Sequence, residues 1–229
     1  MDESTTSAET RLNLGAGRTH IPGFVNIDIS RRADITLDLG RDRLPFADDS
    51  VSLVFSYHTL EHVTDYLFAV AEIHRVLRHG GRFLVGLPYV TLTEYHLVNP
   101  YHHHDFNEYS FDFFDPSRLR GSAVEDHPVH FRKVFHSFHY IGAFHLVPPP
   151  LRTWCRRHLL NVVRKIDFGL VAVKDPEHGL PTLDAVEFRR QFRQCLHSRV
   201  PYDAAPARAT RPAGRPLAGR VRAWWNGHA

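Results

Sequence analysis

Five short apolar runs in the first part of the chain constrain its fold more than any other feature. Each run consists of apolar or β-branched residues and is bounded by glycine and acidic residues, which form turns. Runs of this kind are typical of strands that are buried on both faces, as in a parallel sheet. We place the five strands at residues 11–15, 24–29, 34–39, 51–56 and 82–87.

The residues between the fourth and fifth of these strands have helical spacing. Apolar side chains recur from Leu60 to Leu77 at intervals of three and four, and Gly80-Gly81 supplies a C-terminal stop. Strands joined in this way predict right-handed crossovers and an open α/β sheet. Ligands of such sheets bind at the carboxyl ends of the strands.

The composition of the chain changes after Pro88. Residues 89–128 are rich in aromatic residues and histidine, and we interpret them as a lid or an acceptor-pocket insertion. A basic amphipathic helix is expected over 151–165, with Leu151, Trp154, His158, Leu159, Val162 and Val163 on one side. The other elements expected here are strands at 129–139 and 166–173 and helices at 109–119 and 182–197.

Composition excludes several classes of protein. No run approaches the roughly 18 to 20 apolar residues of a membrane span, and the first ten residues lack the features of a secretory signal, so we expect a cytoplasmic protein. Residues 203–229 hold five arginines and one acidic residue, so this segment accounts for the net charge of +3 and the rest of the chain is nearly neutral. A nearly neutral body argues against a nucleic-acid-binding core. Two cysteines cannot form a disulfide framework.

A glycine turn and an acidic residue predict a ligand site at the ends of the first strands. In LNLGAG, Gly15 and Gly17 leave no Cβ between the backbone and a ligand. Asp28 ends the second strand, only 11 residues after Gly17, so the first crossover is one helical turn around Thr19–Pro22. This short turn does not suit a pyrophosphate. Asp28 can accept hydrogen bonds from both hydroxyls of a ribose, and Asp38 can hold a base or fix its own loop.

Three stretches together resemble the class I S-adenosylmethionine-dependent methyltransferases. They are LNLGAG with Asp28, then DLGRDRLPFADDSVSLVFSYHTLEHV, then EIHRVLRHGGRFLVGLP, and they resemble a short-crossover subgroup with an NLGxG…NxD opening. The resemblance implies an α/β, Rossmann-like open sheet of seven strands in the order 3-2-1-4-5-7-6. Strand 7 is then antiparallel, and helices cover both faces.

The resemblance also implies a cofactor, S-adenosylmethionine, and the residues that hold it. Gly15 and Gly17 would line its methionine portion, Asp28 its ribose, and Asp38 with Leu39 its adenine. Ser56, Tyr57 and His58 would face the methyl group or the acceptor. The full set expected to bind the cofactor is Asn13, Gly15, Ala16, Gly17, Asp28, Ile29, Asp38, Leu39, Ser56 and Tyr57.

A concentration of histidine suggests the catalytic base. Of 18 histidines, nine lie between Tyr95 and His145. A near-neutral imidazole suits proton removal from an acceptor hydroxyl, so we expect His102, or else His58, to be the general base, with Asp105 or Glu108 as the orienting acid. The residues expected to bind the acceptor are His62, Tyr101, His103, His104 and Glu108.

Other motifs compete with this interpretation. His58-Thr-Leu-Glu61-His62 matches a five-residue zinc-hydrolase pattern, and His102-His103-His104-Asp105 could present two imidazoles to a metal, but we assign no metal site. Asn99-Pro100-Tyr101 is an incomplete form of a motif from nucleic-acid and protein methyltransferases. A SAM-binding regulatory or scaffold protein without turnover is the main alternative function.

The sequence thus predicts a methyltransferase for a small-molecule acceptor, most plausibly a hydroxyl of a sugar or specialised metabolite. Helix 151–165 and the basic tail could contact an anionic membrane or a partner. Acceptor atom and oligomeric state stay open. We divide the chain into a disordered leader (1–10), a class I methyltransferase domain (11–175) with the 89–128 insertion, a helical extension (176–202) and an Ala/Pro/Arg-rich disordered tail (203–229).

Overall fold

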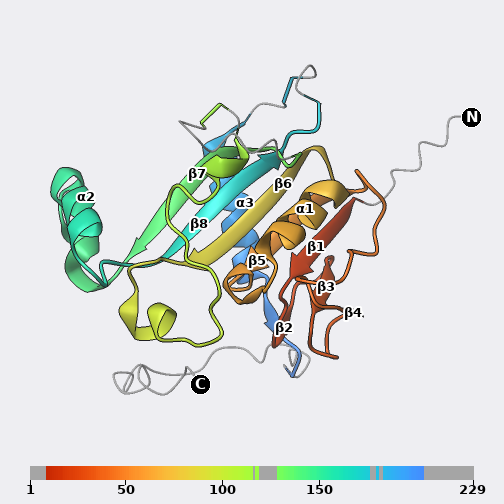
Figure 1. Ribbon diagram of the computed structural model, residues 1–229, viewed down its shortest axis with the longest axis horizontal. Helices are drawn as coiled ribbons and strands as arrows, with labels where there is room; N and C mark the ends of the chain where they lie inside the picture. Colours follow the sequence, from red (N-terminus) through yellow and green to blue (C-terminus); the bar gives the residue numbers. More distant parts are fainter. Residues whose placement is uncertain (1–8, 116, 119–127, 176–178, 181–182, 204–229) are drawn as a thin grey trace, which may run out of the picture.

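A seven-stranded sheet forms the centre of the computed structural model (Figure 1). The structure describes residues 9–115, 117–118, 128–175, 179–180 and 183–203, so most of the expected leader and tail lies outside the described residues. The sheet strands are β1 (Thr10–Leu14), β3 (Val25–Asp28), β4 (Ile35–Thr36), β5 (Val51–Tyr57), β6 (Leu77–Pro88), β7 (Phe131–Tyr140) and β8 (Val163–Ala172).

The strand order confirms the expected topology. The order across the sheet is β4-β3-β1-β5-β6-β8-β7, which is 3-2-1-4-5-7-6 when these strands are numbered along the chain. The first five strands run parallel, and β8, the seventh, runs antiparallel to both of its neighbours. The central strands of the sheet, β5 and β6, are buried on both faces over most of their length, which explains why the sequence shows continuous apolar runs there.

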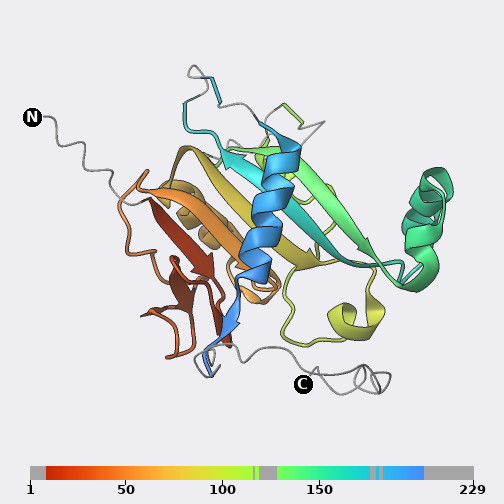
Figure 2. The same cartoon turned by 180° about the vertical axis from the view of Figure 1, so that it is seen from behind.

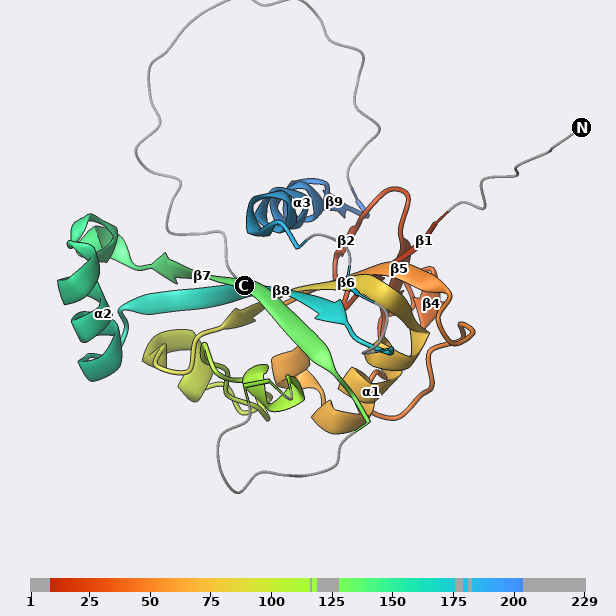
Figure 3. The same cartoon turned by 90° about the horizontal axis from the view of Figure 1, so that it is seen from above.

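Helices cover both faces of the sheet, as expected. Helix α1 (Tyr66–Val76) packs Val70 and Ile73 into the larger apolar core, and α3 (Ala185–His197) packs Phe188 and Phe192 into a second core on the opposite face (Figures 1 and 3). Both helices begin at an aspartate whose side chain accepts a backbone hydrogen bond, Asp65 and Asp184.

The segment between β5 and β6 differs from the expected single helix. A 3-10 turn, η1 (Leu60–His62), precedes α1, and the helix ends at Val76 rather than at Gly80-Gly81. Both glycines lie within β6, because the strand begins at Leu77, which pairs with Val51 of β5. Pairing with a neighbouring strand therefore overrides the local glycine stop signal.

Two other expected helices are wrong. Residues 109–119 contain only a 3-10 turn, η3 (Asp112–Phe114), within the part that the structure describes. The expected helical turn at Thr19–Pro22 is instead a short strand, β2 (Thr19–His20), paired antiparallel with β9 (Val200–Pro201). The partner strand comes from the far end of the described chain, so the local sequence does not reveal it (Figure 2).

The segment expected to form a pocket also contributes to the main core. Tyr89, Phe106, Phe111 and Phe114 are buried in the same apolar cluster as α1. Two further turns lie around this region, η2 (Thr93–Leu97), which is π-helical, and η4 (Gly142–Leu146), which is 3-10. The aromatic rings of this segment thus pack into the main core, whereas none of its histidines among the described residues belongs to that apolar cluster.

Helix α2 (Pro149–His158) projects from the end of the β7–β8 hairpin (Figures 1 and 3). It is shorter than the expected 151–165, because Val163 already belongs to β8. Cys155 and Arg156 are its buried residues, whereas Leu151 and Trp154 are 54% and 51% exposed. Among the described residues, no helix has both the length and the apolar character needed to span a membrane.

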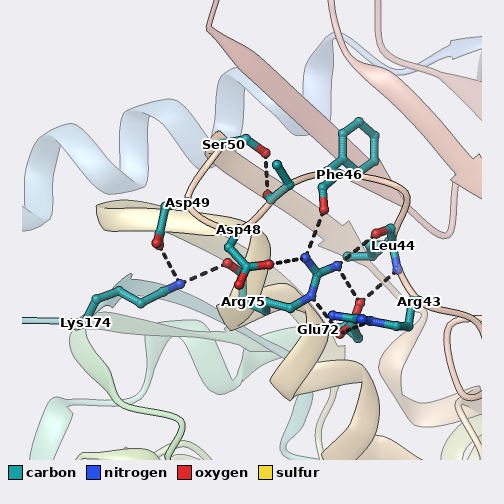
Figure 4. Close-up of polar contacts among 10 residues, drawn as sticks. Arg43, Leu44, Phe46, Asp48, Asp49, Ser50, Glu72, Arg75 and Lys174 are labelled. Atoms are coloured by element: carbon teal, nitrogen blue, oxygen red, sulfur yellow. Dashed lines mark hydrogen bonds and ion pairs between the residues drawn. The ribbon is translucent and has the colours of Figure 1, made fainter.

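Arg75 holds the loop between β4 and β5 against α1. Its guanidinium donates to both carboxylate oxygens of Glu72, at 2.8 and 2.7 Å, to Asp48, and to the carbonyls of Leu44 and Phe46 (Figure 4). Glu72 also accepts the backbone N–H of Leu44 at 2.9 Å. These contacts order a long irregular loop, which leads directly into the central strand β5.

We expect Arg75→Met to lower the free energy of unfolding by about 3 kcal/mol, because it leaves the largely buried Glu72 carboxylate without its main partner. Arg75 holds the pKa of Glu72 below its usual value. The stabilisation is therefore full at neutral pH and is lost as the pH falls below 4.5. Denaturant unfolding at several pH values measures both effects.

Arg78→Met is the matched control, because Arg78 pairs with Glu9 on the surface, where both side chains are about half exposed. Its cost should stay below about 1 kcal/mol. Equal costs for the two variants would contradict the role given to Arg75.

Candidate functional site

The glycine turn after β1 has two glycines with different surroundings. Gly15 and Gly17 both have positive φ, +71° and +60°, which favours glycine. A Cβ added to Gly15 would lie 1.9 Å from the hydroxyl oxygen of Thr59, whereas one added to Gly17 would meet nothing within 4 Å. Gly15 is therefore required by the close approach of Thr59, and Gly17 leaves backbone open above the strand ends.

Asp28 ties the end of β3 to this turn. Its carboxylate accepts the N–H of Gly17 at 2.8 Å through one oxygen and the N–H of Ser30 at 2.7 Å through the other. A carboxylate offers about four acceptor positions, so two remain for a ligand. The next side chain, Ile29, is 73% exposed and offers an apolar surface beside them.

A pair of buried asparagines supports the turn from below. Asn13 donates its side-chain amide to Asn26 at 2.9 Å, and Asn26 in turn accepts the N–H of Ile21 at 2.8 Å. Asn26 also bonds Asp34 through both its backbone and side-chain nitrogens. The side chain of Asn13 is thus bonded inside the fold, so Asn13 could contact a cofactor only through its backbone atoms.

The remaining residues expected near a cofactor follow β4 and β5. Asp38 accepts the N–H of Gly40 at 2.9 Å, which fixes the loop in which Leu39 is buried. Ser56 is fully buried at the end of β5, and its hydroxyl has no hydrogen-bond partner among the described residues. Tyr57 follows it, with its ring 4.5 Å from the ring of His58.

Six charged or titratable groups gather beside the turn, from segments 58–62 and 96–105. The Nδ1 atoms of His96 and His102 lie 2.7 Å apart, and Nε2 of His96 lies 2.8 Å from Oδ1 of Asp105. The ring of His62 packs 4.6 Å from that of His102. The structure thus brings His102 and Asp105 together through His96, a residue that was not predicted for the site.

His58 reaches the same cluster through a second unpredicted residue. Nδ1 of His58 lies 3.2 Å from Oε1 of Glu61, which is only 1% exposed. Oε2 of Glu61 is buried and has no hydrogen-bond partner among the described residues. The H-x-x-E-H spacing contains both residues, so the sequence carried a signal for Glu61 that was assigned to a different chemistry.

The environment of His102 suits a base. Burial, with the nearby charge of His62, holds the pKa of His102 below its usual value. The imidazole is therefore mainly neutral at pH 7 and able to accept a proton.

Glu61, His62 and His102 could also hold a metal ion. One donor atom from each lies within 4.8 Å of the others, the only such group of three among the described residues. Two imidazoles and a carboxylate form a donor set for zinc or iron. No metal ligands were assigned from the sequence, so this juxtaposition is new.

The other expected acceptor residues are dispersed. Glu108 is buried and bound by Arg156 and by the Tyr89 hydroxyl, so its carboxylate is occupied away from His102. His104 bonds the Val63 carbonyl at 2.9 Å. Tyr101 and His103 are exposed, and they join the cluster through backbone atoms bonded to His62 and Glu61 respectively.

Comparison with known families identifies one segment of the chain. Residues 24–85 match a family model described as a methyltransferase domain. This segment runs from the start of β3 into β6 and contains Asp28, Glu61 and His62. The expectation of a methyltransferase-type domain is thus confirmed for these residues.

Two curated proteins share sequence with the chain. A probable S-adenosylmethionine-dependent methyltransferase of Mycolicibacterium smegmatis is 39% identical over 86 residues, which are 36% of this chain and 33% of that protein. The putative methyltransferase YrhH of Bacillus subtilis is 43% identical over 44 residues, 19% of this chain and 24% of that protein. The chain therefore spans a third or less of the length of these relatives.

Solved structures with a similar fold include two at low sequence identity. The YcgJ protein of Bacillus subtilis aligns with 73% of this chain and 93% of its own, at 16% identity and a TM-score of 0.49. A putative methyltransferase in complex with the Haloferax volcanii Trm112 methyltransferase activator aligns with 72% of this chain and 83% of its own, at 18% identity and a TM-score of 0.47.

Proposed function

We propose that this protein is an S-adenosylmethionine-dependent methyltransferase. The observation that carries the proposal is the carboxylate of Asp28, fixed beside the open backbone of Gly17 within a chain whose residues 24–85 match a methyltransferase domain. The two free acceptor positions of Asp28 suit the ribose hydroxyls, and exposed Ile29 suits the adenine face. The cofactor would place its methyl group toward Tyr57 and the histidine cluster.

The acceptor in this proposal is a hydroxyl of a small molecule, such as a sugar or specialised metabolite. S-adenosylmethionine bound at this site would supply the methyl group, which the acceptor oxygen would take by in-line displacement with loss of S-adenosylhomocysteine. Nε2 of His102 takes the hydroxyl proton, because its Nδ1 is engaged with His96. Asp105 and His96 act as positioning residues that favour this tautomer.

We also propose that the protein contacts anionic membranes through α2. Residues 141–165 contain no acidic residue, and α2 carries the exposed Arg157 together with the exposed Leu151 and Trp154. A projecting helix with exposed apolar residues and cationic neighbours is typical of interfacial binding. An acceptor carried at a membrane would then meet the site without leaving the lipid surface.

Calorimetric titration with S-adenosylhomocysteine tests the cofactor. We expect the parent to bind and Asp28→Asn to bind about 30-fold more weakly, because hydrogen bonds to a charged acceptor are lost. Asp49→Asn, which changes an exposed surface pair with Lys174, should bind like the parent. A folded parent that does not bind would overturn the proposal.

Methyl transfer to hydroxyl acceptors tests the base. His102→Gln should lower kcat at least about 100-fold, whereas His145→Gln, at an exposed histidine outside the cluster, should not. Since the pKa of His102 lies below 6.5, the rate of the parent should be constant above that pH and fall below it. If a chelator abolishes the rate and a divalent ion restores it, His102 binds a metal instead.

Co-sedimentation with vesicles tests the membrane contact. The parent should bind vesicles that contain phosphatidylglycerol but not vesicles of phosphatidylcholine alone, and Leu151→Ser with Trp154→Ser should abolish binding. Val186→Ser, which removes an exposed apolar residue of α3, is the control and should bind like the parent. Equal binding by all variants would exclude α2, and dimerisation lost in the double variant would assign it to a second copy.

A further inference from the structure

The C-terminal part of the described chain packs against the glycine turn. Strand β9 pairs with β2, which begins only two residues after Gly17 (Figure 2). The N–H of Tyr202 donates to the carbonyl of Arg18 at 3.1 Å. These contacts place the residues that join α3 to β9 at the carboxyl edge of the sheet, far outside the segment that matches the family model.

Arg199 lies at this junction and reaches two strand ends. Its Nε donates to the hydroxyl of Thr19 at 3.0 Å, and that hydroxyl donates to the carbonyl of Ala16 at 3.1 Å. Its guanidinium carbon lies 5.1 Å from the centre of the Tyr57 ring, at the end of β5. Arg199 therefore lies between the glycine turn after β1 and Tyr57, the last residue of β5.

Among the described residues, Arg199 forms no ion pair with a carboxylate, and its terminal guanidinium nitrogens make no hydrogen bond. Three other arginines that are withdrawn from solvent have a carboxylate partner, Arg75 with Glu72, Arg82 with Glu187 and Arg156 with Glu108. Arg152 and Arg189, which are also partly buried, bond the His145 carbonyl and the Ser137 hydroxyl instead. Burial lowers the pKa of Arg199. A partly buried cation without a partner is costly, and an anionic ligand removes that cost.

We propose that Arg199 binds the carboxylate of the methionine moiety of the methyl donor. The inference rests on the proposed function, in which that carboxylate is the only anion of the cofactor and the methionine portion lies against the glycine turn. The guanidinium nitrogens left free by Thr19 then donate to the carboxylate oxygens. The α3–β9 segment thereby completes the donor site and selects ligands that carry the amino-acid group.

Two ligands that differ in the amino-acid group separate this role from a structural one. S-adenosylhomocysteine has the carboxylate, and 5′-methylthioadenosine lacks it but keeps the nucleoside and sulfur. By calorimetry, we expect Arg199→Met to bind S-adenosylhomocysteine about 10- to 100-fold more weakly than the parent. Its affinity for 5′-methylthioadenosine should stay within about twofold of the parent's, since no bond to that ligand is lost.

Two further variants sharpen the test, with thermal unfolding as the check on folding. Arg199→Lys keeps the charge and should recover part of the affinity for S-adenosylhomocysteine. Arg193→Met, on the exposed side of α3, should match the parent for both ligands.

Each other result overturns the inference. Unchanged affinity of Arg199→Met for S-adenosylhomocysteine would show that the carboxylate is bound elsewhere. Equal weakening for both ligands would show that Arg199 only supports the turn through Thr19. A folded parent that binds neither ligand would overturn the proposed function and this inference with it, and so is distinct from the first two results.

Discussion

The hydrogen bond from the N–H of Gly17 to Asp28 is the contact on which the candidate site depends. It joins the ends of β1 and β3, which parallel pairing already brings to one edge of the sheet. The crossover between them is too short for a helix, so a side chain must fix the turn directly. The buried side chains of Asn13 and Asn26 also join these two strands: Asn13 donates to Asn26, and Asn26 accepts the N–H of Ile21 in the crossover. The open backbone above Gly17 is the result.

The histidine cluster shows how one segment can serve both the core and the site. Residues 89–115 bury Phe106 and Phe111 against the sheet, and the same stretch returns His102 and Asp105 to the edge next to Glu61. The backbone bond from His103 to the Glu61 carbonyl fixes this approach at 2.7 Å. Aromatic burial thus supplies the rigidity that holds the imidazoles within bonding distance, as a site with defined proton positions requires.

Much of the sheet could be predicted because its strands are specified locally. Strands that are buried on both faces can be recognised from their continuous apolar residues, and the glycine and acidic residues between them indicate the turns. Errors arose where a distant partner decided the local conformation. Leu77 extends as a strand because Val51 pairs with it, and Thr19 extends because Val200 and Pro201 lie beside it. Helix α2 ends early because Val163 enters the sheet.

The sequence by itself determined the positions of most strands, the glycine turn and the position of Asp28, because these depend on residues close together in the chain. The order of the strands was expected only from the resemblance to a known family. Only the tertiary structure decided which polar side chains share the site. His96 and Glu61 join His102 through packing of separate segments, and Glu108 is removed from it by Arg156. Arg199 reaches Thr19 across 180 residues. No local pattern encodes such a contact, since it forms only when the folded sheet brings both ends of the chain to one edge.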